Sequence, residues 1–340
     1  MTNFPEIIRN EIPEKKIVIV GDLVADQFLR GTIARVSREA PVFILRHDET
    51  ETSAGGAANA AVNVASLGGN AVLIGLVGAD KNGRVLLEKL RSSNVNCDFV
   101  VESAKIQTTT KVRVLAGQHY APRQQVIRID YENQISPDED LRRKLRENLS
   151  QAARNADAII ISDYDYGVAD EQVFEQARRI SAEKGIPLLI DSRFRLKNFP
   201  SATTATPNQD EVEQILGVKF TAEDCADLRE KLGYQALLVT RGNKGMLLVE
   251  KDRAPLIIEA VGATEPVDVT GAGDTVIAVY ALGLACGLSF AESARLANHA
   301  GGIVVMKKGT ASVTAEELIV SVEKQNELSA GEMPAFSLNK

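Results

Sequence analysis

Five short runs of β-branched and other apolar residues recur along the chain, and three of them end in an aspartate. Runs that are apolar at nearly every position are typical of strands buried on both faces of a parallel sheet. Helix-like stretches at 138–155 and 170–184 separate some of the runs, so strand and helix alternate. The pattern predicts an α/β fold with a mainly parallel central sheet. The five runs are Lys16–Asp22, Ala71–Gly78, Ala158–Asp163, Pro187–Asp191 and Ala236–Gly242.

Polar residues gather at the carboxyl ends of these predicted strands. Asp22, Asp163 and Asp191 each end a run, and another run ends in the turn 240–242. In open α/β sheets, ligands bind beyond the carboxyl ends of the strands. Any one of these residues alone also fits a turn or a helix cap. Four together predict a ligand site at this edge of the sheet.

Two further stretches, 42–53 and 108–132, alternate polar and apolar residues. Alternation is typical of half-exposed antiparallel strands. We therefore expect a small sheet that stands off the main body as a lid, with strands drawn from about 26–53 and 108–133. An ordinary edge sheet is the alternative interpretation. The chain as a whole, 1–340, is expected to form one domain.

Bulk composition limits the classes of partner. The chain has 340 residues, 44% of them hydrophobic, and a net charge of −7, which argues against nucleic acid or an anionic membrane as a partner. No apolar run reaches the roughly 18 residues of a membrane span, and the first residues lack the apolar core of a signal peptide. The three scattered cysteines fit a reducing compartment. We expect a cytoplasmic protein that binds a small molecule.

The stretch 266–287, "PVDVTGAGDTVIAVYALGLACG", places Gly271, Ala272 and Gly273 at the entrance of an apolar helix. Helix N-termini present unpaired N–H groups and the positive end of the dipole, and glycines allow close approach, so this entrance predicts an anion site. Asp274 follows in the first turn. It could simply stabilise the helix, or it could take a proton from a hydroxyl while the N–H groups hold negative charge. The second arrangement is what phosphoryl transfer to an alcohol needs.

Competing motifs are missing from the sequence. There is no GxxxxGK[ST] or GxSxG motif, and Val276 stands where a Rossmann fingerprint would have its third glycine. A hydride-transfer enzyme is therefore disfavoured. A second glycine cluster, at 53–69, opens another helix and includes Gly55, Gly56 and Asn59. It fits either tight helix packing or a turn beside a sugar.

The two glycine clusters together resemble the signatures of the ribokinase-like (PfkB) carbohydrate kinases. "GGAANAAVNVASLG" is similar to the N-terminal signature and "DVTGAGDTVIAV" to the C-terminal one, and the resemblance extends over about 16–322. It implies a three-layer α/β/α fold with a small antiparallel β lid, ATP as phosphoryl donor and Mg²⁺. It makes Asp274 the general base and gives the anion hole to the amides of Gly271, Ala272 and Gly273. The residues expected to hold the sugar are Asp22, Asp26, Gly55, Gly56 and Asn59.

Shorter matches extend the resemblance to the nucleotide and the ions. "TPNQDE" implies that Asn208 and Glu211 lie near Mg²⁺ without binding it directly. "TRGNKGM" and "ANHAGGIVV" imply that Thr240, Gly242 and Asn298 contact the nucleotide. In many members a monovalent cation such as K⁺ also binds. The residues expected around it are Asp268, Thr270 and Ser312.

Within the family, the lid stretches and "SDYDYGV" resemble the kinases of D-glycero-D-manno-heptose 7-phosphate, which act on the anomeric hydroxyl and belong to the ADP-heptose route to lipopolysaccharide. That substrate needs cations, and the resemblance adds these substrate-binding residues: Lys111, Arg113, Arg128, Asp163 and Arg193. Two departures stand out, "DSRF" where Pro-Lys usually follows the aspartate, and "DYDYG" where a small residue and a lysine are common. The alternatives are a kinase of fructose or ribose and a non-catalytic sugar-binding protein. Exposed lid edges favour a homodimer.

Overall fold

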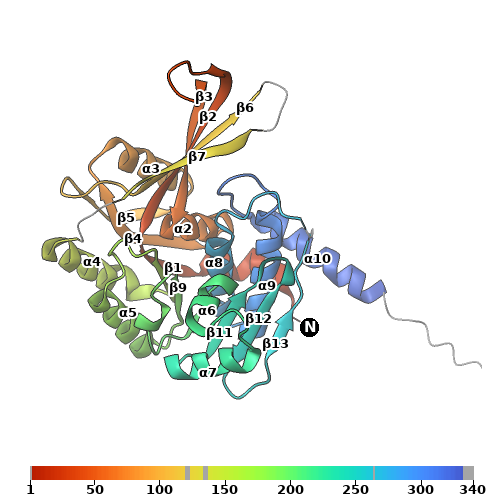
Figure 1. Cartoon of the computed structure of the whole chain (residues 1–340). Helices are drawn as coiled ribbons and strands as arrows, with labels where there is room; N and C mark the ends of the chain where they lie inside the picture. The colour runs from red at the N-terminus through yellow and green to blue at the C-terminus, as the bar shows by residue number, and fades with distance from the viewer. Residues whose placement is uncertain (1, 119–122, 133–136, 263–264, 332–340) are drawn as a thin grey trace, which may run out of the picture.

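The computed structural model describes residues 2–118, 123–132, 137–262 and 265–331, with the side chains of 326–331 left out. In the described residues, nine strands form the main sheet in the order β13-β12-β11-β10-β9-β8-β1-β4-β5 (Figure 1). They are β1 (Lys16–Gly21), β4 (Asn70–Gly78), β5 (Asn96–Ser103), β8 (Ala158–Asp163), β9 (Leu188–Ser192), β10 (Thr204–Ala205), β11 (Ala236–Thr240), β12 (Met246–Glu250) and β13 (Leu256–Ile258).

The sheet is parallel from β5 through β11 and antiparallel only where β12 and β13 add to one edge. At its centre, Ile19 of β1 lies opposite Leu73 of β4 on one side and Ile160 of β8 on the other. This register brings the carboxyl ends of β1, β8 and β9 to one edge of the sheet. Asp22 directly follows β1, Asp163 is the last residue of β8, and Asp191 is the next-to-last residue of β9.

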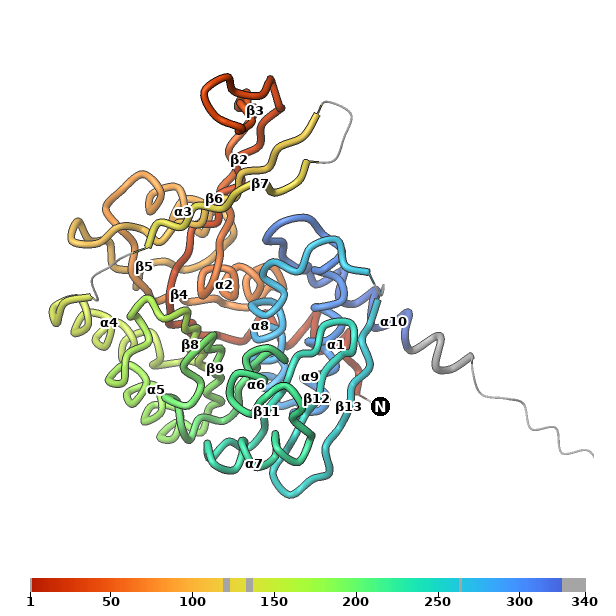
Figure 2. Tube along the Cα trace, in the orientation of Figure 1, coloured from red at the N-terminus to blue at the C-terminus, as the bar shows by residue number. Residues whose placement is uncertain are grey.

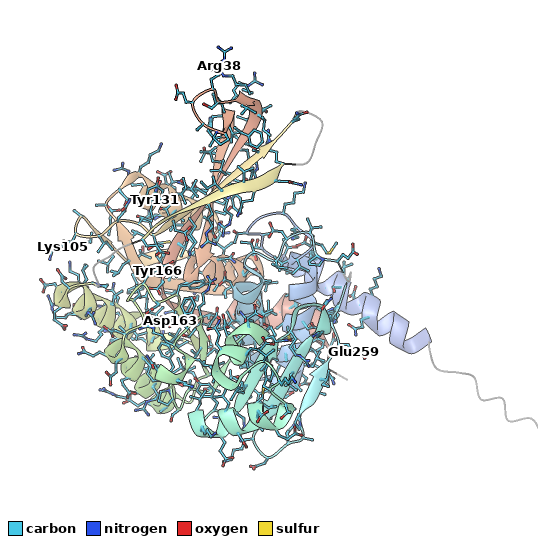
Figure 3. The ribbon with its side chains drawn as sticks, in the orientation of Figure 1. Arg38, Lys105, Tyr131, Asp163, Tyr166 and Glu259 are labelled. Atoms are coloured by element: carbon cyan, nitrogen blue, oxygen red, sulfur yellow. The ribbon has the colours of Figure 1, made fainter. Side chains whose placement is uncertain are left out.

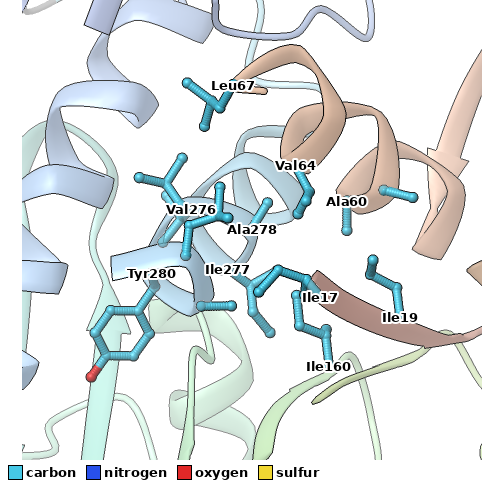
Figure 4. Packing of buried hydrophobic residues seen from close by; sticks show 14 of the residues in the cluster. Ile17, Ile19, Ala60, Val64, Leu67, Ile160, Val276, Ile277, Ala278 and Tyr280 are labelled. Carbon is cyan, nitrogen blue, oxygen red and sulfur yellow. The ribbon is translucent and has the colours of Figure 1, made fainter. Parts of the chain in front are cut away.

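Helices cover both faces of the sheet. Side chains of α2, α3, α8, α9 and α10 pack with Ile17 and Ile19 on one face, and those of α4 to α7 pack with Val18 and Val20 on the other. Figure 4 shows the first core, where Ala60 and Val64 of α2 approach Ile277 of α8 above Ile17. The helices are α1 (Phe4–Glu6), α2 (Ala57–Ser66), α3 (Lys81–Ser92), α4 (Glu139–Ala152), α5 (Glu171–Lys184), α6 (Gln209–Leu216), α7 (Ala222–Leu232), α8 (Ala272–Ala285), α9 (Phe290–Val304) and α10 (Ala315–Gly331).

Helix α8 is apolar on all sides because it is enclosed by the protein. Its residues from Asp274 to Gly283 are all buried, as expected for a helix with no solvent-facing stripe. Gly283 packs closely against α9, since a Cβ there would lie 2.8 Å from the hydroxyl oxygen of Ser293. The N-terminus of α8 points to the edge of the sheet where the aspartates gather.

Four strands form the lid, which projects from the body in Figures 1 and 2. The strand order is β3-β2-β6-β7, from β2 (Leu23–Val36), β3 (Phe43–Gly56), β6 (Thr110–Gly117) and β7 (Gln124–Tyr131). The outer pairs are antiparallel, and β2 and β6 pair in parallel at the centre. Within the range expected for the lid, residues 119–122 and 133 lie outside the described residues. The expected fold, a layered α/β body with a small β lid, is confirmed.

In the part of the chain that the structure describes, no helix has both the length and the apolar character needed to cross a membrane.

Candidate active site

Asp274 lies in the first turn of α8, and only 3% of its surface is exposed. Both carboxylate oxygens accept hydrogen bonds. Asn59 Nδ2 of α2 donates to Oδ2 at 2.8 Å, and the Tyr164 hydroxyl donates to Oδ1 at 3.0 Å. Burial raises the pKa of Asp274 to about 7, although these two hydrogen bonds favour the charged form. A carboxylate with a pKa near neutrality is suited to act as a general base.

The entrance to α8 is formed as the sequence predicts. Gly271 is the N-cap with φ +78°, and its carbonyl accepts a hydrogen bond from Asn59 Nδ2 at 3.3 Å. A Cβ at Gly271 would lie 2.5 Å from that nitrogen, so only glycine fits. The N–H of Ala272, which was expected in the anion hole, instead donates to the carbonyl of Val269. The N–H groups of Gly273 and Asp274 lie in the first turn, where the helix offers no carbonyl partner.

Asp22 holds the loop that follows β8. Its carboxylate accepts backbone hydrogen bonds from Tyr164, Tyr166 and Val168 at 2.8–3.1 Å, so we call residues 164–168 the anchored loop. Burial raises the pKa of Asp22 to about 6, against the effect of the three N–H groups. Asp22 therefore lies at the expected edge, but its oxygens support the loop.

Asp163, at the end of β8, is also engaged by the protein. Its buried carboxylate accepts hydrogen bonds from Ser192 Oγ at 2.7 Å and from the guanidinium of Arg195. Arg195 also lies 3.0 Å from Asp165 of the anchored loop. These partners occupy the carboxylate that was expected to meet the sugar. They tie the end of β8 to the loop after β9.

Asp26 of β2 and the two glycines at the end of β3 meet at the root of the lid. The carboxylate of Asp26 is paired with the guanidinium of Arg113 on β6. A Cβ on Gly55 would lie 2.4 Å from Asp26 Oδ2, and one on Gly56 would lie 3.3 Å from the ring of Tyr164. The small residues of this cluster therefore make room for the side chains that border the site.

The other lid cations also have acidic neighbours. Arg128 donates two hydrogen bonds to Asp130 at 2.8 and 2.5 Å, and the Lys111 ammonium lies 3.7 Å from Asp130. Lys111 is buried, and its Nζ lies 5.5 Å from the ring centre of Tyr166. The Tyr166 hydroxyl donates to Glu132 at 2.6 Å. In Figure 3, Tyr166 lies between the lid strand that ends at Tyr131 and the body around Asp163.

Arg193 differs from these cations. Its side chain is exposed and its guanidinium lies 5.4 Å from the ring centre of Phe194. Its charge acts on Lys111, Tyr164 and Glu211, which places it beside the site. Of the four cations expected to bind substrate, it is the one with no ion pair in the described part of the chain.

Asn208 and Glu211 form a capping box at the start of α6. Asn208 accepts from the N–H of Glu211, and the Glu211 carboxylate accepts from the N–H of Asn208, each at 2.9 Å. Burial raises the pKa of Glu211. Burial, followed by the charges of Asp274 and Glu211, raises the pKa of Asp191 well above its ordinary value.

Mg²⁺ fits this group of oxygens. It is commonly bound by one or two carboxylates together with phosphates and water, and a cation here would offset the mutual repulsion of Asp191 and Glu211. No group of three or more acidic, histidine or cysteine side chains in the described residues could hold a metal by itself. Substrate phosphates would therefore have to supply the remaining ligands.

A pocket of about 180 Å³ lies beside the entrance of α8. Thr240, Gly242, Ala272, Gly273 and Asn298 are among its lining residues, so it brings the expected nucleotide residues together. Much of its lining is apolar, which suits a flat heterocycle. The Asn298 amide donates to the carbonyl of Glu259 at 2.7 Å and holds one wall in place.

The residues expected around a monovalent cation are already engaged. The Asp268 carboxylate accepts from the N–H groups of Thr270 at 3.0 Å and Gly309 at 2.9 Å. Although burial opposes the shift, these hydrogen bonds hold the pKa of Asp268 below its ordinary value. The carbonyl of Ser312 accepts from Lys307 Nζ at 2.7 Å. The Lys307 ammonium is itself paired with Glu317 at 2.7 Å.

Two residues of the site, Tyr164 and Arg195, were not among the site residues predicted from the sequence. Asp191 was predicted to lie at the ligand edge of the sheet, with Asp22 and Asp163, but without a role of its own. Arg195 was passed over in favour of Arg193, two positions earlier. Tyr164 lies in the stretch "SDYDYGV", but nothing in that stretch shows its contact with Asp274, which is 110 residues away in the chain.

Comparisons with known proteins agree on the family and the fold. The family model "pfkB family carbohydrate kinase" matches residues 14–317. The chain is 40% identical over 310 residues to the bifunctional protein HldE of Proteus mirabilis. The aligned region covers 89% of this chain and 62% of that protein. It is 39% identical over 331 residues to HldE of Hahella chejuensis, covering 95% of this chain and 66% of that protein. The chain thus spans just under two thirds of these relatives.

Solved structures show the same fold. Ribokinase of Arabidopsis thaliana, complexed with ribose and ATP, aligns with a TM-score of 0.70 at 21% identity over 91% of this chain and 98% of that one. Phosphofructokinase-2 of Escherichia coli, in complex with potassium, aligns with a TM-score of 0.74 at 19% identity over 92% and 99%. From the family model and the relatives at about 40% identity, the chain belongs to the pfkB family of carbohydrate kinases.

Proposed function

We propose that this protein transfers the γ-phosphoryl group of ATP to a hydroxyl of D-glycero-D-manno-heptose 7-phosphate, at the anomeric position. One observation carries the proposal: a buried carboxylate with a pKa of about 7, Asp274, stands beside the open N-terminus of α8. In this role the protein acts in the cytoplasm, in the ADP-heptose route to lipopolysaccharide.

The proposed chemistry uses two groups at the entrance of α8: the carboxylate of Asp274 and the N–H groups of the first turn. Asp274 accepts the proton of the sugar hydroxyl, so the oxygen becomes a better nucleophile. The first-turn N–H groups, together with the helix dipole, stabilise negative charge on the phosphoryl group as it moves. Mg²⁺, when bound near Glu211, would neutralise phosphate charge. The nucleotide binds in the pocket that Asn298 lines, and the sugar binds on the opposite side of the entrance of α8.

The cations near the lid support a phosphorylated substrate. Arg113, Arg128 and Lys111 each have a carboxylate nearby, whereas the Arg193 guanidinium has none within ion-pair distance in the described residues. A guanidinium binds phosphate through paired hydrogen bonds. Arg193 is therefore the cation most readily available to a phosphate that enters the site.

Arg193→Ala is expected to raise KM for the sugar 7-phosphate about tenfold or more, because a charged hydrogen bond contributes about 1.5–3 kcal/mol. KM for ATP should change little. Arg193→Lys should keep part of the affinity, and Arg128→Ala should have a smaller effect, since Asp130 binds that guanidinium. Steady-state kinetics with the phosphorylated and unphosphorylated sugar measure the difference. An equal rise in KM for both sugars would contradict this role.

The test of the function is ATP consumption by the purified protein with a panel of acceptors. The panel holds D-glycero-β-D-manno-heptose 7-phosphate, fructose, fructose 6-phosphate, ribose and adenosine, with Mg²⁺, and with and without K⁺. Selective turnover of the heptose phosphate supports the proposal. Turnover of fructose or ribose instead would identify "DSRF" and "DYDYG" as marks of another specificity. Turnover of none would favour a non-catalytic sugar-binding protein.

The lid edge supports a homodimer. Strand β7 is exposed along its whole length. Ile127, Ile129 and Tyr131 share one of its faces, and each is more than 40% exposed. Exposed strand edges with apolar side chains favour pairing with another strand. We expect a dimer in sedimentation velocity, and we expect Ile127→Glu to shift it to monomer without unfolding it. A wild-type monomer would contradict this assembly.

A further inference from the structure

Tyr164 is the second partner of the Asp274 carboxylate, and it comes from a part of the chain that neither glycine signature includes. Its hydroxyl donates to Oδ1 at 3.0 Å, while Asn59 occupies Oδ2 at 2.8 Å. We infer that Tyr164 is a positioning residue for the base: its hydroxyl fixes the orientation of the Asp274 carboxylate and favours its ionised form. The inference rests on the proposed function, in which Asp274 is the base.

The hydroxyl is held in place by contacts at the other end of the residue. The N–H of Tyr164 donates to Asp22 Oδ2 at 2.8 Å, so the backbone is fixed to the end of β1. The ring lies against Gly56, where a Cβ would come within 3.3 Å of the ring carbon Cε2. Gly56 has φ +60°, a conformation that also favours glycine. Asp22 and Gly56, both predicted to hold sugar, thus have a second role in supporting the tyrosine.

The arrangement leaves Asp274 able to react. Each carboxylate oxygen can accept two hydrogen bonds, so one position on each oxygen remains for the substrate hydroxyl. Burial, and then the charge of Asp274, raise the pKa of Tyr164 well above its ordinary value. The tyrosine therefore stays protonated at working pH. It donates a hydrogen bond and does not compete for the proton.

Other groups around Asp274 also influence its protonation. Asp26 of β2 raises the pKa of Asp274, and the carboxylates of Asp274 and Asp191 of β9 repel each other. The charge of Arg193, which follows β9, lowers the pKa of Tyr164. Asn59 of α2 is neutral and favours the ionised form. None of these groups is changed by removal of the tyrosine hydroxyl, so that removal isolates one contact.

The test compares two single-hydroxyl deletions on the anchored loop, Tyr164→Phe and Tyr166→Phe. Tyr166 lies two residues after Tyr164. Its substitution removes the hydrogen bond to Glu132 and leaves Asp274 untouched. Loss of a hydrogen bond to a charged group is worth about 1.5 kcal/mol or more, which corresponds to about one pH unit. We expect Tyr164→Phe to move the acidic limb of the kcat/KM profile up by about one unit, with most activity recovered at alkaline pH. Tyr166→Phe should leave that limb in place.

A second measurement does not depend on turnover. Titration of protein labelled with ¹³C at aspartate Cγ reports the pKa of Asp274 directly, with the resonance assigned by its absence in Asp274→Asn. The resonance should titrate at higher pH in Tyr164→Phe and at the wild-type pH in Tyr166→Phe. An unchanged titration in Tyr164→Phe, or a loss of kcat that is equal at every pH, would overturn the inference. Failure of the proposed function is separate, since it appears as a wild type that does not turn over the heptose phosphate.

Discussion

Asp274→Asn is expected to lower kcat by about 10²- to 10⁴-fold, the usual contribution of a general base. The amide has almost the shape of the carboxylate but cannot accept the proton of the sugar hydroxyl at neutral pH. ATP affinity should change little, because the nucleotide pocket lies on the other side of the helix entrance. Coupled ATP-consumption kinetics measure kcat, and isothermal titration calorimetry measures the affinity for ATP.

Stability provides the control for this variant. Burial raises the pKa of Asp274 from its ordinary value of 3.8 to about 7, so the ionised carboxylate disfavours the folded state above pH 7. This cost diminishes as the pH falls through 7 and is absent below about pH 4. Asp274→Asn removes the charge, so its Tm at pH 8 should equal or exceed that of the wild type. Retention of wild-type turnover by the folded variant would exclude Asp274 as the base.

Gly271→Ala is expected to lower kcat about 100-fold, although it adds a single methyl group. The new Cβ would lie 2.5 Å from Asn59 Nδ2 and 3.0 Å from Thr310 Cγ2. Relief of this overlap moves Asn59, which donates a hydrogen bond to Asp274. Displacement of a catalytic group by about 1 Å can cost about 10²-fold in rate. The measurement is kcat at saturating sugar and ATP.

Gly287→Ala is the matched control at the other end of α8. Gly287 has φ +80°, close to the +78° of Gly271, so both substitutions bear the same backbone cost of about 1–2 kcal/mol. A Cβ at Gly287 meets no heavy atom within 4 Å. Gly287→Ala should therefore lower the free energy of unfolding and leave kcat unchanged. Equal losses of kcat in the two variants would mean that strain, and not displacement of Asn59, causes the effect.

Much of the fold could be predicted from the sequence because its signals are local. The apolar runs became β1, β4, β8, β9 and β11, and the glycine cluster at 271–273 became the entrance of α8. Strands such as β10, with two residues, and β12 and β13 at the antiparallel edge carry too few residues or too little periodicity to be recognised alone. Their place depends on the neighbouring strands.

The site was harder to predict than the fold, since it depends on which partners each side chain meets. A strand-end aspartate has the same local sequence whether its carboxylate is open to a ligand or accepts three backbone N–H groups, as that of Asp22 does. Asp163 likewise gives no sign in the sequence that Arg195, 32 residues later, neutralises it. Such contacts are settled by the packing of distant segments. The sequence identifies candidate groups, and the three-dimensional structure assigns their partners.

The burial of the lid strands has a consequence for how such enzymes diversify. Strand β2 is buried at its root, from Leu23 to Asp26, and exposed at its tip, and β3 is buried only at its last residues, Ala54–Gly56. The root carries Asp26, Gly55 and Gly56, whereas the tip carries exposed side chains far along the same strands. Substitutions at the tip are therefore expected to leave the buried root and its contacts undisturbed. A single hairpin thus joins a root whose sequence is constrained by burial to a tip whose sequence is free to vary.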